Sequence, residues 1–306
     1  MEKSQKGFIP VMLTPFSDDG TIDYYALETL TEHYLNSGAK GLFANCLSSE
    51  MFELTEAERL SLTARVVQLA GGRVPVVATG TFGGPVADQA EFVKRIYDTG
   101  IEAVILITSL ICGEDDADEV FNEKVEELLH LTPSVPVGFY ECPVPFKRVL
   151  SATQLGHFVA TDRVIYHKDT SLDIVQVKAK LAAAQHPGFG LYDAYMGHAV
   201  ASLKAGAAGL SCIQGNFFPE LVVWLCENYN NPNVSAEVDA LQEFLIMHMD
   251  VMHDVYPFAA KYALQQQGMS ISTFTRRHVG NFSSAHARGI EALYADYHQL
   301  RSEIGL

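Results

Sequence analysis

The sequence predicts an α/β protein, a (β/α)8 TIM barrel that carries a C-terminal helical appendage. Three observations predict this fold class. Eight short apolar runs alternate with stretches of helical periodicity. The same glycine-containing turn pattern recurs before three of these runs, and only helical patterns follow about residue 234. We therefore expect the barrel with its active site over residues 1–233 and helices packed on the barrel over residues 234–306.

A repeated turn marks the step from helix to strand. Its three copies are SGAKGLFANC from Ser37, TGIEAVILIT from Thr99 and AGAAGLSCIQ from Ala205. Each copy has a small residue, a glycine and then an apolar run, which is typical of a helix that stops at a C′ glycine before a buried strand. The stretches YYALETLTEHYLN and QAEFVKRIYD, which precede two of these turns, are amphipathic at helical spacing. TEAE, from Thr55 to Glu58, is a capping box that begins the next helix.

The expected strands follow one another at regular intervals along the chain. In order, they cover about residues 8–14, 41–46, 75–79, 102–108, 136–140, 163–168, 188–192 and 208–213. A helix fits between every two of them, and eight such units in about 230 residues match a closed parallel barrel. The alternative is an open doubly wound sheet. That fold would place a Gly-rich phosphate loop after the first strand, where this chain has TPFSDDG.

Composition limits the classes of partner. The 306 residues include 48% hydrophobic residues and carry a formal net charge of −16. We expect no nucleic-acid and no membrane partner, because nucleic acids and anionic membranes are bound by clustered Lys and Arg and no run of about 18 apolar residues could span a bilayer. The N-terminal MEKSQKGFIPVMLTPF is interrupted by Pro10 and Pro15, so we interpret it as a mature first strand and not as a signal peptide.

The cysteines and histidines give no sign of a metal site. Five cysteines lie far apart without a CxxC pair, and the eleven histidines show no metal-binding spacing. We expect buried free thiols in a reducing cytoplasm, no metal and no cofactor.

The candidate active site follows from the rule that barrel chemistry sits at the carboxyl ends of the strands. The sixth apolar run, VIYH, leads directly into Lys168, and the fifth ends at Tyr140. These residues are one βα unit apart, so they should end neighbouring strands and bring a phenol and an amine together over the barrel mouth. Strand alternation places Lys168 and Tyr166 on one face and His167 on the other.

The residue types at this end of the barrel suit chemistry on a 2-keto acid. A desolvated Lys168 could attack a ketone as a neutral amine and form an imine, and the Tyr140 hydroxyl could carry the proton. Ser48 and Ser49, with the N–H groups of their turn, could bind the carboxylate, and Asp193 follows the seventh strand. Each feature also has an ordinary explanation: lysines and tyrosines often end strands, and a Ser-Ser pair is usually a turn.

Three stretches carry a family resemblance. GFIPVMLTPFSDDGTIDYYALETLTEHYLNSGAKGLFANC, KDTS at Lys168, and Tyr140 with Pro143 resemble the first two βα units, the Schiff-base lysine motif and the Tyr-x-x-Pro of the dihydrodipicolinate synthase and N-acetylneuraminate lyase family. The resemblance implies a class I aldolase that acts on pyruvate or another 2-keto acid, usually as a homotetramer. It implies imine formation at Lys168, proton transfer at Tyr140, carboxylate binding at Ser48 and the adjacent turn, and a keto acid close to the backbone of Ser211.

Several positions depart from the family pattern. The usual GTTGE is CLSSE here, so Leu47 replaces a hydroxyl residue of the usual proton relay, and Thr108-Ser109-Leu110-Ile111 lacks the tyrosine that often reaches a neighbouring subunit. Glu141 stands where the family often has Asn, and about Pro145 replaces the arginine that grips the second substrate in dihydrodipicolinate synthase. These departures disfavour dihydrodipicolinate synthase activity. They leave two functions open, an imine-forming lyase, aldolase or dehydratase, and a lapsed enzyme that binds a keto acid or carbonyl compound.

The sequence also suggests a pocket wall. We expect Leu110, Ile111, Cys142 and Cys212 along the far end and Asp193 at the mouth. Such a wall predicts a modest, partly apolar aldehyde as the second half of the substrate.

Overall fold

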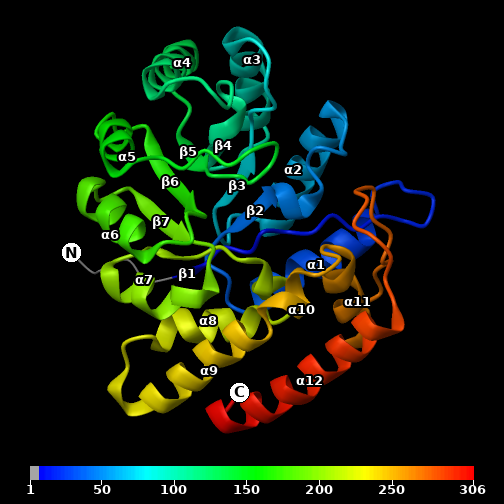
Figure 1. The fold of residues 1–306 in the computed structure, drawn as a ribbon. Helices are drawn as coiled ribbons and strands as arrows, with labels where there is room; N and C mark the ends of the chain where they lie inside the picture. The colour runs from blue at the N-terminus through cyan, green and yellow to red at the C-terminus, as the bar shows by residue number, and fades with distance from the viewer. Residues whose placement is uncertain (1–6) are drawn as a thin grey trace.

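The structure is a computed structural model that describes residues 7–306. The segment MEKSQK, which begins the stretch that we interpret as a mature first strand, lies outside the described residues. All neighbouring strands pair in parallel, in the order β1-β8-β7-β6-β5-β4-β3-β2. Figure 1 shows the helices arranged around this sheet.

Each predicted strand overlaps an observed one. The strands are β1 (Gly7–Phe8, beginning one residue before the predicted range), β2 (Leu42–Asn45), β3 (Val76–Thr79), β4 (Ala103–Ile107), β5 (Val137–Tyr140), β6 (Val164–Asp169, ending one residue after it), β7 (Gly190–Asp193, likewise) and β8 (Gly209–Leu210). The two edges meet beyond β1: Val11 bridges to Phe43, whose N–H donates to the Pro10 carbonyl at 3.0 Å. This closure confirms the (β/α)8 barrel and excludes the open doubly wound sheet.

Eight helices alternate with the strands along the chain. They are α1 (Tyr24–Asn36), α2 (Glu56–Ala70), α3 (Val86–Tyr97), α4 (Asp118–Leu131), α5 (Ala152–Val159), α6 (Ile174–Ala183), α7 (Ala199–Ala205) and α8 (Pro219–Asn228). The predicted turn glycines Gly38, Gly100 and Gly206 all have positive φ, between 92° and 116°, which glycine adopts without steric penalty. The predicted capping box is present as well, because Thr55 and Glu58 exchange hydrogen bonds at the start of α2.

The core has two parts. One buried cluster, which includes Phe43, Ile105, Tyr140 and Tyr166, fills the inside of the barrel. A larger one lies between the strands and the helices. Successive residues of a strand alternate between the two, as Leu106 faces the helices and Ile105 the interior.

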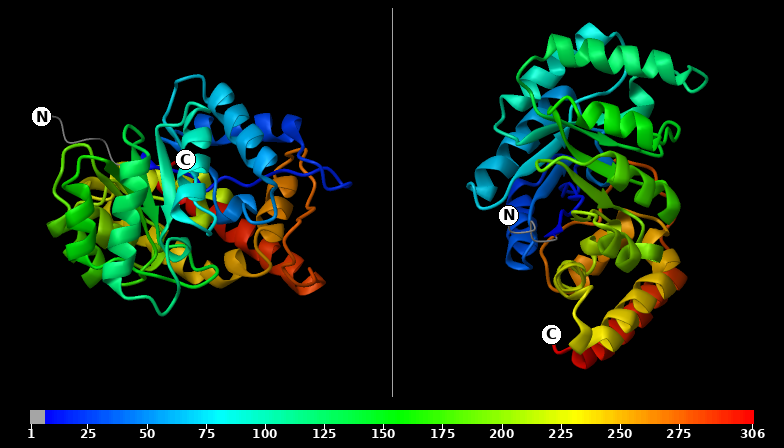
Figure 2. Two further views of the ribbon diagram at one scale, coloured as in Figure 1. Left: turned by 90° about the horizontal axis from the view of Figure 1, so that it is seen from above. Right: turned by 90° about the vertical axis from the view of Figure 1, so that its left-hand side faces the viewer.

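Beyond α8 the described chain forms helices and connections and no further strand. It forms α9 (Ser235–Met247), α10 (Met249–His253), α11 (Phe258–Gln266) and α12 (Ser284–Ile304). The right-hand view of Figure 2 shows these helices on one side of the barrel, where α9 and α12 contact each other and α9 contacts α8. Whether a domain boundary falls near residue 234 stays a prediction. Among residues 7–306, no helix is long and apolar enough to cross a membrane.

Candidate active site

Lys168 lies inside the barrel near the carboxyl end of β6. Parallel pairing sets Tyr140 of β5 directly beside it, as their spacing predicts. The Lys168 Nζ lies 4.3 Å from the centroid of the Tyr140 ring and 5.9 Å from that of Phe43. Only 4% of Lys168 is exposed. The amine is therefore held in an aromatic environment at the base of the barrel mouth.

The surroundings of Lys168 favour its neutral form. Burial lowers the pKa of the amine, and the groups that oppose this effect are the cysteines Cys46, Cys142 and Cys212. Among the described residues, no carboxylate forms an ion pair with Lys168. A lysine without a counter-ion in such a site can act as a nucleophile at neutral pH.

Tyr140 is the nearest group that could move a proton. Burial, with a smaller contribution from Cys142, holds its pKa well above the usual phenol value. The hydroxyl therefore stays protonated and can donate. Tyr166, also inside the barrel, is committed elsewhere, since its hydroxyl donates to Ser211 Oγ at 3.3 Å and its ring stacks on Tyr192.

The two predicted serines, Ser48 and Ser49, lie in the turn after β2 but face different surroundings. Leu47 and Ser48 line a pocket above Lys168. Ser49 does not: it is fully buried, and its hydroxyl lies 2.6 Å from the Met12 carbonyl, to which it donates. The reason is that Ser49 closes the turn, where it also accepts the Cys46 N–H at 3.1 Å. The expectation that Ser49 offers its side chain to a ligand is therefore corrected.

The pocket encloses about 310 Å³ and opens at the barrel mouth. Three groups of residues line it. The ends of β5 and β6 and the segments after β2, β5 and β6 supply Leu47, Ser48, Tyr140, Pro143, Lys147, Lys168, Thr170 and Leu172. The segments after β7 and β8 supply Ala194, Tyr195, Ser211, Cys212, Ile213 and Gln214, and the C-terminal region supplies His253, Tyr256 and Arg277. A volume of this size suits a small substrate.

Asp193 lies outside this lining. It is 1% exposed, and its Oδ1 accepts the Tyr195 N–H at 2.9 Å. Its Oδ2 lies 2.9 Å from His198 Nε2. Asp193 thus shapes the loop that carries Tyr195, and its predicted place at the mouth is corrected.

The far wall also differs from the predicted one. Cys212 lines the pocket, whereas Leu110, Ile111 and Cys142 do not. Among the lining residues that sequence reasoning missed are His253, Tyr256 and Arg277. No local signal identifies these three, because they lie in the C-terminal region and not at a strand end.

The lining combines apolar side chains with cationic ones. Among the described residues that line the pocket, none is an Asp or Glu, whereas Lys147 and Arg277 are cations. Lys147 Nζ donates to the Thr170 carbonyl at 2.6 Å. Arg276 pairs with Glu58 at 2.6 Å, but within residues 7–306 the adjacent Arg277 has no carboxylate at ion-pair distance.

A buried ion pair fixes the C-terminal segment that carries Arg277. Lys261 of α11 lies 2.8 Å from Glu50, the residue that ends the Leu47–Ser49 turn. The backbone N–H groups of Arg276 and Arg277 donate to the other oxygen of Glu50 at 2.6 and 2.9 Å. The turn beside the pocket and the connection between α11 and α12 are thereby held together.

A second group of buried charges lies behind β5 and β6. Glu141, His167 and Asp169 place possible metal-ligand atoms within 4.8 Å of one another. The Lys180 ammonium of α6, however, lies 2.5 Å from Glu141 and 2.7 Å from Asp169. Since this internal cation already neutralises the carboxylates, the residues do not fit a metal.

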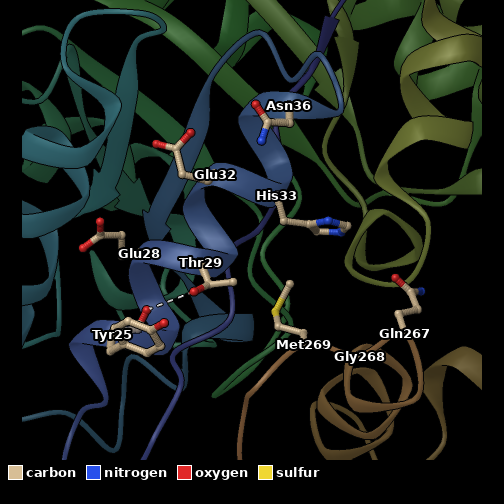
Figure 3. Close-up of a pocket in the computed structure, with 9 residues that line it drawn as sticks. All are labelled: Tyr25, Glu28, Thr29, Glu32, His33, Asn36, Gln267, Gly268 and Met269. Atoms are coloured by element: carbon tan, nitrogen blue, oxygen red, sulfur yellow. Dashed lines mark hydrogen bonds between the residues drawn. The ribbon is translucent and has the colours of Figure 1, made fainter.

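Another hollow lies outside the barrel, between α1 and the end of α11 (Figure 3). It is an open groove of about 570 Å³ lined by Tyr25, Glu28, Thr29, Glu32, His33, Asn36, Gln267, Gly268 and Met269. Its carboxylates are paired, Glu28 with Arg65 and Glu32 with Arg73. Without a nucleophile held beside an acid or base, this groove is the weaker candidate for catalysis.

Known proteins resemble this chain in sequence and in fold over most of its length. The 4-hydroxy-tetrahydrodipicolinate synthases of Saccharophagus degradans and Bacillus subtilis are each 25% identical to this chain, over 271 and 265 residues, with 86% of this chain and 89% of each relative covered. A prophage protein of E. coli K12 from the dihydrodipicolinic acid synthase family, solved with pyruvate, shares the fold at a TM-score of 0.84 and 20% identity, over 97% of this chain and 98% of that one.

Other solved structures agree on the fold. A monomeric dihydrodipicolinate synthase variant superposes with a TM-score of 0.87 at 18% identity, over 97% of this chain and 98% of that one. The sequence model of the Dihydrodipicolinate synthetase family matches residues 4–295, nearly the whole chain. This match and the barrel with its strand-end lysine lead to one conclusion: the chain belongs to the dihydrodipicolinate synthetase family.

Proposed function

We propose that the protein is a class I lyase or aldolase that forms an imine between Lys168 and pyruvate or another 2-keto acid, without a further cofactor. One observation carries the proposal. The Lys168 amine is buried inside the barrel, lacks a carboxylate partner among the described residues and faces the Tyr140 ring at 4.3 Å. A neutral amine beside a protonated phenol is the pair that imine chemistry needs.

The reaction begins with attack of the Lys168 amine on the keto carbon. Loss of water then leaves a protonated imine, which accepts the electron pair released when an adjacent C–C or C–H bond breaks. Tyr140 gives or takes the proton at the substrate. Ser48, with the turn that carries it, and Ser211 lie on the pocket wall where they can hold the carboxylate and the neighbouring atoms of the keto acid.

The second half of the substrate is proposed to be polar and anionic. Lys147 and Arg277 at the pocket wall favour a carboxylate or phosphate there. The partly apolar aldehyde expected from the sequence stays a prediction, since Leu47, Leu172 and Ile213 also line the pocket. We retain the proposal that the reaction differs from that of typical dihydrodipicolinate synthases, because Leu47 and the region of Pro145 depart from their pattern.

A lapsed enzyme that binds a keto acid is the second candidate. The observation that favours it is Leu47, which lines the pocket where family members carry a relay hydroxyl. Such a protein would form the imine, or bind the carbonyl compound, without turnover. Assays on a panel of 2-keto acids, with the synthase reaction of the relatives run in parallel, separate the two candidates.

The decisive experiment is borohydride reduction in the presence of pyruvate, followed by mass spectrometry of the peptides. Wild-type protein should gain one covalent adduct on Lys168, and Lys168→Ala should gain none. Lys204→Ala, which removes an exposed lysine of α7, is the matched control and should be labelled like the wild type. Undiminished labelling of Lys168→Ala would overturn the assignment.

We also propose a cytoplasmic homo-oligomer, a tetramer or a dimer, on the basis of the family resemblance. Analytical ultracentrifugation of the full chain measures the mass directly. A monomer at micromolar concentration would contradict this proposal without affecting the imine.

A further inference from the structure

A phenol from the C-terminal region lines the same pocket as Lys168 and Tyr140. Tyr256 lies in the short connection between α10 and α11, 88 residues after Lys168 in the chain. Its side chain is brought to the barrel mouth by the packing of the C-terminal helices. Nothing in the imine chemistry described above uses it.

Hydrogen bonds fix the direction in which this phenol can donate. Asn216 Nδ2 lies 2.9 Å from the Val11 carbonyl oxygen. Since a carbonyl oxygen can only accept, the Asn216 atom that faces it must be the amide nitrogen, which donates. The Asn216 Oδ1 in turn accepts the Tyr34 hydroxyl at 2.6 Å. Asn216 Nδ2 also donates to Tyr256 Oη at 2.5 Å. Since Tyr256 accepts from Asn216, its own hydrogen must point elsewhere.

Ser48, the proposed carboxylate ligand, lines the same pocket as Tyr256. Burial is the main influence on the pKa of the Tyr256 phenol, and the nearby Ser48 hydroxyl acts against it and lowers the pKa. The net effect raises that pKa, so Tyr256 is protonated at neutral pH. Tyr256 is also among the groups that raise the pKa of Tyr140, so the two phenols influence each other electrostatically.

A single phenol leaves the proton path incomplete. The proton that leaves the substrate must be passed on before the next cycle, and Tyr140 is buried at 3% exposure. Leu47 on the same wall has no hydroxyl to receive it. Tyr256 lies at the pocket and is oriented by the Asn216 amide, so its hydroxyl is suited to this task.

We infer that Tyr256 is a catalytic residue that relays the proton between Tyr140 and the substrate or bulk water, and that Asn216 positions it. With pyruvate bound as the imine, the C–H bond of its methyl group breaks. The electron pair forms the C=C bond of the enamine and neutralises the iminium nitrogen, while the proton passes to Tyr140 and on through Tyr256. The reverse path returns a proton to the same carbon. This inference rests on the proposed imine chemistry.

The test uses pyruvate alone and two readouts. Borohydride trapping measures the imine, and NMR in D2O measures exchange of the pyruvate methyl protons. Tyr256→Phe retains the ring and removes the hydroxyl. We expect exchange to slow by about 100-fold or more, within the usual range of an acid–base group, while trapping changes less than about threefold. The exchange rate of the variant should also lose part of its pH dependence.

Two further variants keep the result interpretable. Tyr294→Phe removes another hydrogen-bonded phenol of the C-terminal layer, which donates to the Ala263 carbonyl at 2.8 Å, and should exchange like the wild type. Asn216→Asp replaces the donor with a carboxylate that accepts from Tyr256 and turns its hydrogen away from the pocket. If it melts like the wild type, it should slow exchange although the phenol is retained.

The outcomes separate the two proposals. Absence of a trapped adduct in the wild type would reject the proposed function. A wild type that forms the imine but does not exchange, or a Tyr256→Phe variant whose exchange stays within about threefold of the wild type, would reject the relay while leaving the imine in place. Equal loss of trapping and exchange in Tyr256→Phe would also reject it, because the hydroxyl would then serve binding and not proton transfer.

Discussion

At the scale of single residues, Lys168 combines burial with the lack of a counter-ion. The folded protein keeps an amine at 4% exposure, near aromatic rings, and burial lowers its pKa. A lysine that served only to stabilise the fold would be paired, as Lys180 and Lys261 are with Glu141 and Glu50. In the proposed reaction, this unfavourable environment of Lys168 is the source of its reactivity.

A stability measurement tests whether burial of the unpaired Lys168 amine destabilises the folded protein. Lys168→Met should raise the free energy of unfolding at pH 7 by about 1–3 kcal/mol, since the buried polar group is removed. The folded pKa lies below the unfolded one, so the unfolded chain binds more protons and wild-type stability rises with pH. The advantage of Met should therefore shrink above about pH 10, where both states are neutral. Urea denaturation measures this, and Lys204→Met is the control. A less stable Lys168→Met variant would contradict the prediction.

A separate prediction concerns proton transfer by the Tyr140 hydroxyl. Tyr140→Phe preserves the ring that lies over Lys168 and deletes the proton donor. The chemical step should slow by about two to four orders of magnitude, and imine trapping should persist. Single-turnover kinetics on an active keto acid measure the effect. A loss below about threefold would assign the proton transfer to another group.

At the scale of elements, the ends of β5 and β6 are joined to α6 through buried charges. The Lys180 ammonium contacts both Glu141 and Asp169, which directly follow Tyr140 and Lys168 in the chain. Glu141 also accepts the backbone N–H groups of Leu150 and Thr170 at 3.0 and 3.1 Å. These bonds fix the backbone that presents the phenol and the amine.

Two titrating groups of this cluster have shifted pKa values. Burial raises the pKa of Asp169, but the nearby His167, whose Nε2 lies 3.7 Å from the carboxylate, and the charge of Lys180 outweigh it, so the net shift is strongly downward. Burial also lowers the pKa of His167, yet the nearby carboxylates Glu141 and Asp169 raise it overall. Asp169 therefore stabilises the fold above its unfolded pKa of about 3.9, and this contribution is lost as the pH falls through the folded value.

Removal of the ammonium should reveal this coupling. Lys180→Met leaves two carboxylates buried without their cation and should destabilise the protein by about 3–5 kcal/mol at pH 7. The loss should shrink at pH 4 and below, because protonation relieves the carboxylates. Lys178→Met on the exposed face of α6 is the matched control and should stay within about 0.5 kcal/mol. Urea unfolding curves at both pH values decide the matter, and equal stability of Lys180→Met and wild type at pH 7 would refute the coupling.

At the scale of the whole molecule, the C-terminal region contributes to the lining of the candidate active site. They bring Tyr256 and Arg277 to a pocket whose base is built from the barrel. The Glu50–Lys261 pair joins residues 211 positions apart and holds this arrangement. Substrate choice is therefore expected to depend on the tail of the chain.

Arg277→Gln tests this dependence. For 2-keto acids with a second carboxylate or phosphate, KM should rise by about 10- to 100-fold, since a charged hydrogen bond contributes about 1.5–3 kcal/mol. Pyruvate trapping should be unchanged. Arg288→Gln, which alters an exposed arginine of α12, is the control. An equal KM effect on keto acids with and without the second anion would show that Arg277 does not read that group.

The sequence alone determined the barrel and the centre of the site. Glycine turns at Gly38, Gly100 and Gly206 and the short apolar runs are local signals, because backbone conformation and burial follow from neighbouring residues. The spacing of Tyr140 and Lys168 by one βα unit sufficed to make them neighbours, since consecutive strands of a parallel barrel pair.

Only the tertiary structure decided the rest of the pocket. In the structure, the Ser49 hydroxyl is hydrogen-bonded inside its own turn, and Asp193 lies outside the pocket lining. Tyr256 and Arg277 line the pocket instead. Periodicity and motif spacing describe residues close in the chain. Which side chains reach the mouth depends on hydrogen bonds and ion pairs between distant segments, such as Glu50 with Lys261, and no local pattern encodes those contacts.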